Sequence, residues 1–401
     1  MSSSRDNFDR HLAQTSDTPI GLEIDRAEGS WIYTTDGRRY LDLIAGIGVS
    51  ALGHGNARVL SAIADQAQRH LHVMVYGEYV IDTQAKLAAR LAELLPPNLG
   101  RIYFTNSGAE AIEGALKTAR KHTGRAGFVA FDGAYHGDTC AALALMGNAT
   151  FRAPFEPLPG PVRHLSYNDV DALHAIDDTI AAVVIEPVQA EGGVRIPDRS
   201  FMIALREHCD DAGAVLIFDE VLTGFGRTGR LFALEHFGVV PDIIVLAKAL
   251  GGGLPLGAFC GSDDLIGKLA RNPPLGHITT FGGHPLSCAA GFASLETIVE
   301  ERLWESAERI GAMIRSGVAQ FAGEEIIDVR ALGALVGIEF ASADVAHRFV
   351  AETIARGVIV NWTLNADRVV RLAPPLIITD EETVFGLNAM RAALDGIRGG
   401  A

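Results

Sequence analysis

Four short apolar runs, separated by helical patterns, constrain the fold of this chain more strongly than any other feature of its sequence. They cover residues 127–131, 181–186, 214–219 and 242–247, and the pattern over 200–212 is typical of the helices between them. Each run is almost continuously apolar, as strands are when both faces of a parallel sheet are buried. The alternation of such strands with helices predicts an α/β fold with a mostly parallel central sheet.

Other elements are predicted before the four apolar runs. We predict a strand at 101–105, a helix from Gly108, and a β-hairpin over 31–41 with its turn at Asp36-Gly37.

The pattern changes after about residue 300, where long helical repeats mix with a few strands. The elements expected there are 304–321, 335–340, 343–356 and 369–372. We therefore predict a large domain over 46–300 and a smaller α+β domain over 301–401. The N-terminal segment, 1–45, is expected to pack against the smaller domain.

Charge and cysteine usage limit the possible partners. The chain has 34 Lys and Arg against 49 Asp and Glu, a net charge of −15, and so no general attraction for nucleic acid or anionic membranes. Its four cysteines form no CxxC pair, so we expect neither disulfides nor a metal site. The sequence offers no secretory h-region and no apolar stretch of 18 residues, so we expect a cytoplasmic protein without a membrane span.

Glycine is unusually frequent, with 44 residues among 401. Many of these glycines follow the predicted strands, and ligands of open parallel sheets bind beyond the carboxyl ends of the strands. We interpret the excess as the sign of a site where backbone and ligand come close.

Reactive side chains follow several predicted strands. Ser107 opens a helix, where free amide groups favour an anion. Tyr135 and His136 offer rings beside glycines, and Asp219 ends an apolar strand. Lys248 follows another strand, where burial would lower its pKa and make it a nucleophile.

Each of these residues also has an ordinary structural explanation, as a helix N-cap, a surface ring, a turn aspartate or an exposed lysine. Glu186 and Glu191 follow a further strand, but no neighbouring histidine completes a metal motif. Together, however, the groups suit pyridoxal phosphate, which presents a phosphate, a flat ring, a ring nitrogen and an aldehyde.

The chain resembles the class III aminotransferases, a pyridoxal-phosphate family of fold type I that includes acetylornithine, ornithine and 4-aminobutyrate aminotransferases. The resemblance extends from about Gly29 to Leu376 and implies a large domain plus a smaller α+β domain built from both termini. Seven ordered motifs carry it: NSGAEA (106–111), GAYHG (133–137), EPVQAEGG (186–193), FDEVLTGFGRTG (218–229), LAKALGGGLPLG (246–257), HITTFGGHP (277–285) and VVRLAPPLII (369–378).

The resemblance implies a role for each residue near the ring. Lys248 would bond to the aldehyde carbon and then transfer protons as general base and acid. Asp219 would keep the pyridine nitrogen protonated. Tyr135 and Val221 would flank the ring, and His136 would support them.

The resemblance also implies contacts at the phosphate and the substrate. The phosphate ligands would be Ser107, Gly108 and Ala109. Thr280 would reach the phosphate of the neighbouring subunit, which implies a homodimer with shared active sites. Arg371 would grip a substrate carboxylate, and Glu191 would pair with Arg371 until that carboxylate arrives.

Three positions depart from common members of the family. Asp138 stands where many relatives have an arginine for a distal carboxylate, and Ile47 stands where ornithine aminotransferases have a tyrosine. Leu222 replaces a frequent glutamine. The first two departures weaken an ornithine or acetylornithine assignment, and YHGDT at 135–139 is closer to the diaminopelargonate type.

We therefore predict a cytoplasmic, homodimeric transaminase that moves an amino group from an amino acid or ω-amine to a 2-oxo acid by a ping-pong mechanism. An aminomutase or a decarboxylating enzyme on the same fold is one alternative. A non-catalytic module that binds pyridoxal phosphate is another. Exposure to an amine donor without acceptor separates the three possibilities.

Overall fold

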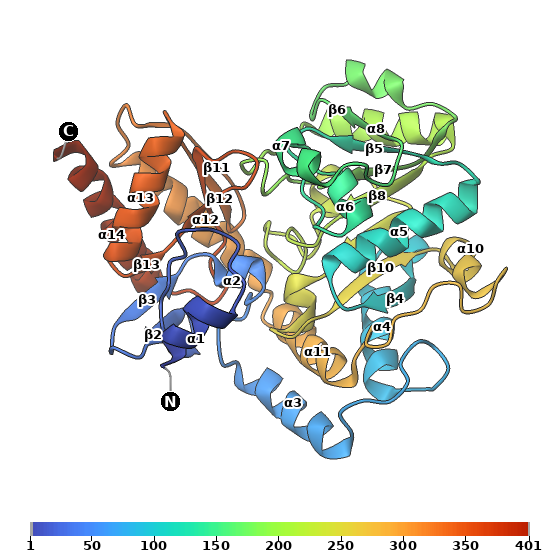
Figure 1. Cartoon of the computed structure of the whole chain (residues 1–401), viewed down its shortest axis with the longest axis horizontal. Helices are drawn as coiled ribbons and strands as arrows, with labels where there is room; N and C mark the ends of the chain where they lie inside the picture. Colours follow the sequence, from blue (N-terminus) through green and yellow to red (C-terminus); the bar gives the residue numbers. More distant parts are fainter. Residues whose placement is uncertain (1–2, 400–401) are drawn as a thin grey trace.

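A seven-stranded sheet forms the centre of the computed structural model, which describes residues 3–399 (Figure 1). Its order is β4-β10-β9-β8-β7-β5-β6, and only β10 (Gly257–Gly261) runs antiparallel to its neighbours. The other strands are β4 (Arg101–Thr105), β5 (Gly127–Phe131), β6 (Val162–Leu165), β7 (Ile180–Ile185), β8 (Val215–Asp219) and β9 (Ile243–Leu246). The predicted α/β fold with a mostly parallel sheet is thus confirmed.

The central strands are apolar throughout because helices cover both faces of the sheet. Every residue of β7 and β8 is buried. Successive side chains of β7 point to opposite faces. Val184 lies in one apolar cluster with the buried face of α5 (Gly108–Thr123), and Val183 lies in another with that of α8 (Arg199–Ala212).

Two smaller sheets lie on one side of the central sheet, together with both termini (Figure 1). One sheet, β1-β2-β3-β13, pairs β3 (Arg39–Asp42) of the N-terminal hairpin in parallel with β13 (Val358–Ile359). The other has the order β11-β12-β15-β14. The remaining strands are β1 (Ile24–Glu28), β2 (Trp31–Thr34), β11 (Ile326–Leu332), β12 (Leu335–Phe340), β14 (Asn361–Trp362) and β15 (Val369–Leu372). The domain boundaries at residues 45 and 300 remain predictions.

Long helices complete the two regions. Near the smaller sheets lie α12 (Leu303–Ala319), α13 (Ala343–Ala355) and α14 (Asp380–Gly399). Beside the central sheet, α11 (Pro285–Glu300) packs against α3 (Ala57–Arg69) and α4 (Asp82–Leu94). The shorter helices are α2 (Ala45–Gly48), α6 (Cys140–Ala144), α7 (Ala149–Arg152), α9 (Leu234–Phe237) and α10 (Asp263–Ile266).

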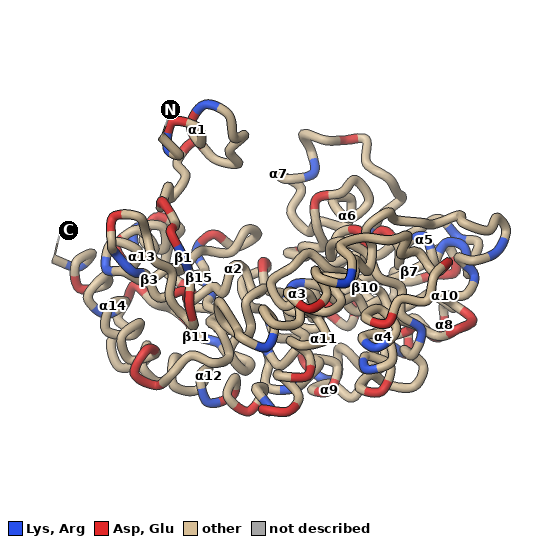
Figure 2. The backbone as a smooth tube through the Cα atoms, turned by 90° about the horizontal axis from the view of Figure 1, so that it is seen from below, with Lys and Arg blue, Asp and Glu red and all other residues tan. Residues whose placement is uncertain are grey.

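Helix α1 (Ser4–His11) has no buried residue. It stands away from the body of the molecule, to which an extended segment connects it (Figure 2). Within residues 3–399, no helix combines the length and the apolar character that crossing a bilayer requires.

Candidate active site

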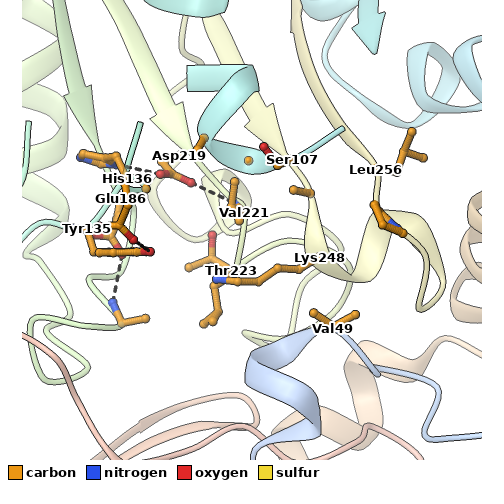
Figure 3. A pocket seen from close by; sticks show the side chains of 18 of the residues that line it. Val49, Ser107, Tyr135, His136, Glu186, Asp219, Val221, Thr223, Lys248 and Leu256 are labelled. Atoms are coloured by element: carbon orange, nitrogen blue, oxygen red, sulfur yellow. Dashed lines mark hydrogen bonds and ion pairs between the residues drawn. The ribbon is translucent and has the colours of Figure 1, made fainter. Parts of the chain in front are cut away.

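A cavity of about 520 Å³ opens beyond the carboxyl ends of β4, β8 and β9. This is the edge at which a parallel sheet is expected to bind its ligand. Figure 3 shows Lys248 extending into the cavity, with Asp219 and Val221 on one side and Tyr135, His136 and Glu186 at another wall. Eight predicted cofactor residues of one chain therefore come together from separate motifs. They are Ser107, Gly108, Ala109, Tyr135, His136, Asp219, Val221 and Lys248.

One end of the cavity is formed by the start of α5. Ser107 is the N-cap, and its Oγ accepts a hydrogen bond from Glu110 N at 3.2 Å. The first intrahelical bond runs from Ala111 N to Ser107 O, so the amides of Gly108 and Ala109 precede it. Such free amides and the helix dipole favour an anion.

Glycine is required where this turn meets its neighbours. A Cβ on Gly108 would lie 2.9 Å from Val221 Cγ2, and a Cβ on Gly137 would lie 2.5 Å from Ala109 Cβ. Gly137 also has a φ of 118°. Only three of the glycines that follow predicted strands, Gly108, Gly137 and Gly253, line the cavity, so the ligand site accounts for a small part of the glycine excess.

Asp219, at the end of β8, is only 5% exposed. Its Oδ1 accepts a hydrogen bond from Val221 N at 3.0 Å, and its Oδ2 lies 2.7 Å from His136 Nδ1. Burial disfavours the charged form of His136, yet the hydrogen bond and charge of Asp219 outweigh it and raise the pKa of the imidazole. The buried His136 Nε2 has no partner among residues 3–399.

Lys248 lies where β9 gives way to the short turn η4 (Lys248–Gly251). Its φ of 49° is in the left-handed region, which is strained for a residue with a side chain. Burial lowers the pKa of Lys248, and the positive charge of Arg371 lowers it further. In the part of the chain that the structure describes, no hydrogen bond or ion pair occupies the amine, so it is free to react.

The ring-flanking candidates occupy the same cavity. Tyr135 is half-buried and donates a hydrogen bond from its hydroxyl to Asp138 Oδ2 at 2.7 Å. Burial raises the pKa of the Tyr135 phenol, and Asp138 raises it further. Asp138, one of the departures from the family pattern, therefore presents a carboxylate to this wall rather than a guanidinium.

Arg371 of β15 forms an ion pair with Glu191, as the resemblance implies. The Arg371 side chain is 1% exposed and that of Glu191 14%. Glu191 lines the cavity, whereas Arg371 lies behind it. Glu191 Oε2 also accepts a hydrogen bond from Leu364 N, which holds the carboxylate beside the guanidinium.

Thr280 is the one predicted cofactor residue that does not line the cavity of its own chain. It is exposed on the segment between η5 (Gly267–Ala270) and α11. Its predicted contact with a neighbouring subunit remains a prediction.

Glu186 was not among the predicted site residues, but it lines the cavity. Its oxygens accept hydrogen bonds from Tyr135 N at 3.0 Å and Ala190 N at 3.1 Å, and burial raises its pKa to about 7. Glu186 follows β7 just as Asp219 ends β8, so its position in the sequence was an available signal. Asn106 and Thr223 were missed as well.

The residues present fit pyridoxal phosphate. The glycine at the start of α5 lets Val221, a candidate ring-flanking residue, pack closely beside free amides suited to a phosphate. Asp219 supplies a buried carboxylate for a ring nitrogen, and Lys248 supplies an unpaired amine for an aldehyde. All these groups face one cavity.

Comparisons with known proteins agree with this geometry. A family model described as aminotransferase class-III matches residues 12–394. The chain is 42% identical over 385 residues to acetylornithine aminotransferase of Methanopyrus kandleri, covering 96% of each protein. It is 40% identical over 390 residues to putrescine aminotransferase of Pectobacterium atrosepticum, covering 93% of this chain and 82% of that protein.

Solved structures give the same result. Ornithine aminotransferase of Toxoplasma gondii, with partial occupancy of PLP at its active site, superposes with a TM-score of 0.90 at 30% identity, covering 98% of this chain and 93% of that one. The ω-transaminase of Pseudomonas jessenii in complex with PMP superposes with a TM-score of 0.92 at 26% identity, covering 98% of each chain.

Proposed function

Since the chain belongs to the class-III aminotransferase family, we propose a division of roles among its own residues in amino-group transfer. The protein is a pyridoxal-phosphate-dependent transaminase of fold type I, acting between amino compounds and 2-oxo acids. When bound, the cofactor supplies an aldehyde that takes up the amine and a ring that withdraws electrons from the adjacent carbon.

We assign proton transfer to Lys248. Its lowered pKa makes the amine neutral in a larger fraction of molecules than an exposed lysine would be, and a neutral amine can accept a proton. Its Nζ would hold the cofactor. It would then take a proton from the donor carbon that bears the amine and deliver it to the aldehyde carbon of the cofactor.

We assign Asp219 to the ring nitrogen and His136 to the support of Asp219. A buried carboxylate is stabilised by a cationic or hydrogen-bonding partner, and a protonated ring nitrogen is such a partner. The His136–Asp219 contact of 2.7 Å fixes the carboxylate, which supports this role. Ser107, Gly108 and Ala109 would hold the phosphate through the free amides of α5.

We infer that the donor carries its amine at the end of a carbon chain. With Arg371 paired to Glu191, the cavity offers no free guanidinium to a donor carboxylate. The relatives named as acetylornithine and putrescine aminotransferases support such a donor. Movement of Glu191 would expose Arg371 to the carboxylate of the 2-oxo acid in the second half-reaction.

We also propose a homodimer, which would bring Thr280 to the partner's phosphate. Gln84 Nε2 donates hydrogen bonds to the carbonyls of Val75 and Gly283, so the segment 71–84 lies beside the segment 276–284. These two segments carry large exposed apolar side chains. They are Leu71, Tyr79, Val80, Ile278 and Phe281. Exposed apolar surface of this kind is typical of protein interfaces, and a second copy of this chain would cover it. The cytoplasmic location stays a prediction.

The observation that carries the proposal is the buried, unpaired amine of Lys248 in the same cavity as Asp219. A half-reaction tests it: the loaded enzyme is mixed with putrescine or alanine, without acceptor, and the aldehyde absorbance of the cofactor is followed. We expect one equivalent of aldehyde to be consumed by putrescine and not by alanine. Lys248→Ala should abolish the change, whereas the surface variant Lys86→Ala should react as the wild type does.

Other outcomes would contradict specific parts of the proposal. Full reactivity of Lys248→Ala would remove that residue from its assigned role. Turnover without net loss of aldehyde would indicate an aminomutase. Equal reactivity of alanine would contradict a donor with a terminal amine.

A further inference from the structure

The segment 276–284, which carries Thr280, is fastened to the junction of β4 and α5. Asn106 Nδ2 donates a hydrogen bond to Thr279 Oγ1 at 2.9 Å. Tyr103 donates one from its hydroxyl to the carbonyl of His277 at 2.8 Å, and Lys117 Nζ lies 2.9 Å from His277 Nδ1. The segment is therefore held at two residues that are separated by one, His277 and Thr279.

Exposure alternates along the tethered part of the segment. His277 and Thr279 are half-buried against the junction, whereas Ile278 is 51% exposed and Thr280 is exposed. The exposed Thr280 therefore directly follows a residue that is hydrogen-bonded to its own chain.

Asn106 is itself fixed by the first turn of α5. Glu110 Oε2 accepts hydrogen bonds from Asn106 N and from Asn106 Nδ2, both at 2.8 Å. Both hydrogens of the Asn106 amide nitrogen are thus used, one toward Glu110 and one toward Thr279. A carboxylate in the first turn of a helix is also stabilised by the helix dipole, which favours Glu110 as the acceptor of these hydrogen bonds from Asn106.

Asn106 consequently lies between two different sites. It precedes Ser107 and lines the cavity of its own chain, and it holds the residue next to Thr280. We propose that Asn106 is a positioning residue that joins the phosphate-binding turn of one protomer to the Thr280 that this protomer delivers to its partner. This inference rests on the shared-site dimer proposed above. Its consequence is that a protomer's cofactor affinity depends on the Asn106–Thr279 bond of the other protomer.

Mixed dimers of two arrangements test this consequence, because Thr279→Val removes the hydroxyl with little change of shape. In the first arrangement, a wild-type chain pairs with a chain that carries both Thr279→Val and Lys248→Ala. In the second, a Thr279→Val chain pairs with a Lys248→Ala chain. Both dimers contain the same substitutions and one Lys248. Only in the first dimer does the site with Lys248 receive Thr280 from a segment that carries Thr279→Val.

We expect the dissociation constant of pyridoxal phosphate at the lysine-bearing site to rise about fivefold in the first arrangement, the effect of about one lost hydrogen bond. It should be unchanged in the second. Thr279→Ser, which keeps the hydroxyl, should restore the affinity in the first arrangement. An equal effect in both arrangements, or no effect in either, would overturn the inference.

Hydrogen exchange of the cofactor-free protein gives a second readout. Thr279→Val and Asn106→Ala should both speed exchange of the amides in 276–284, whereas Thr150→Val on the exposed surface of α7 should leave them unchanged. Unaltered exchange in both tethering variants would contradict the proposed role.

A third dimer separates this inference from the dimer proposal. In it, a wild-type chain pairs with a Lys248→Ala chain that carries Thr280→Val instead of Thr279→Val. If that variant has no effect on cofactor affinity, the delivery of Thr280 to the partner is wrong. If it weakens affinity while Thr279→Val does not, the dimer proposal stands and the role of Asn106 is wrong.

Discussion

At the scale of single residues, the site depends on how buried polar groups are partnered. Asp219 is paired with His136 Nδ1, and Glu186 accepts hydrogen bonds from two backbone amides. Lys248 has no such partner in the described part of the chain, and this distinguishes a reactive group from a structural one.

His136→Phe tests the support of Asp219. The substitution keeps a ring of similar size but removes the donor to a carboxylate that is 5% exposed. Losing a hydrogen bond to a buried charged group costs about 1–3 kcal/mol, so the free energy of unfolding of the cofactor-free protein should fall by about that amount. Urea unfolding measures it, with the exposed His11→Phe as control. Equal stability of both variants would show that Asp219 does not depend on His136.

The sequence revealed Lys248 and Asp219 because each follows a run of apolar residues. It did not reveal that Glu186, in the same kind of position, uses its oxygens on backbone amides, since this depends on how the loop after β7 folds back. The pairing of Glu191 with Arg371 joins residues 180 positions apart and could be expected only from the family resemblance.

At the scale of elements, most strands of the central sheet were predicted in place, but β6 and β10 were missed. β10 is as fully buried as β8 and β9, but two of its five residues are glycines, and its antiparallel course beside β9 left no trace in the pattern. Helix α11 was missed because most of its residues are buried, which removes the apolar–polar alternation of a surface helix. The left-handed turn at α2, where Ala45 and Ile47 have positive φ, was not expected from side chains that disfavour it.

Glu220 fastens one functional element, the long turn between β8 and α9. Its oxygens accept hydrogen bonds from Ala233 N at 2.6 Å and Leu234 N at 2.8 Å. Burial raises the pKa of Glu220 to about 7 in the folded protein, from an ordinary value of 4.5. The folded protein therefore holds a proton between these two pH values that the unfolded chain has released.

Because the folded pKa is the higher one, the contribution of Glu220 to stability is complete below pH 4.5 and is lost as the pH rises through 7. A glutamine side chain does not titrate. The free energy of unfolding of Glu220→Gln should therefore rise relative to that of the wild type, by up to about 3 kcal/mol between about pH 4.5 and pH 8. Urea unfolding of both proteins at about pH 5 and pH 8 measures the change. The exposed Glu324→Gln should keep a constant difference from the wild type, and a constant difference for Glu220→Gln would place the pKa of Glu220 near its ordinary value.

At the scale of the whole molecule, the apolar side chains that remain outside the core indicate what the chain assembles with. The sequence predicted a large core but could not separate apolar residues that are buried within the chain from those left on its surface. Phe281 is 54% exposed and contacts His72, with ring centroids 4.9 Å apart, on the surface formed by the segments 71–84 and 276–284.

Phe281→Asp should weaken the proposed dimer, because it places a charge where an apolar ring would be covered by the partner. Burial of a phenylalanine contributes about 1.5–3 kcal/mol, and an unpaired charge adds to the loss, so the dimer dissociation constant should rise at least about tenfold. Sedimentation equilibrium over a range of protein concentrations measures it. Phe155→Asp is the matched control, since Phe155 is 64% exposed but lies outside both segments. A dissociation constant changed by Phe155→Asp and not by Phe281→Asp would place the interface elsewhere, and Thr280 could then not reach a partner's phosphate by this face.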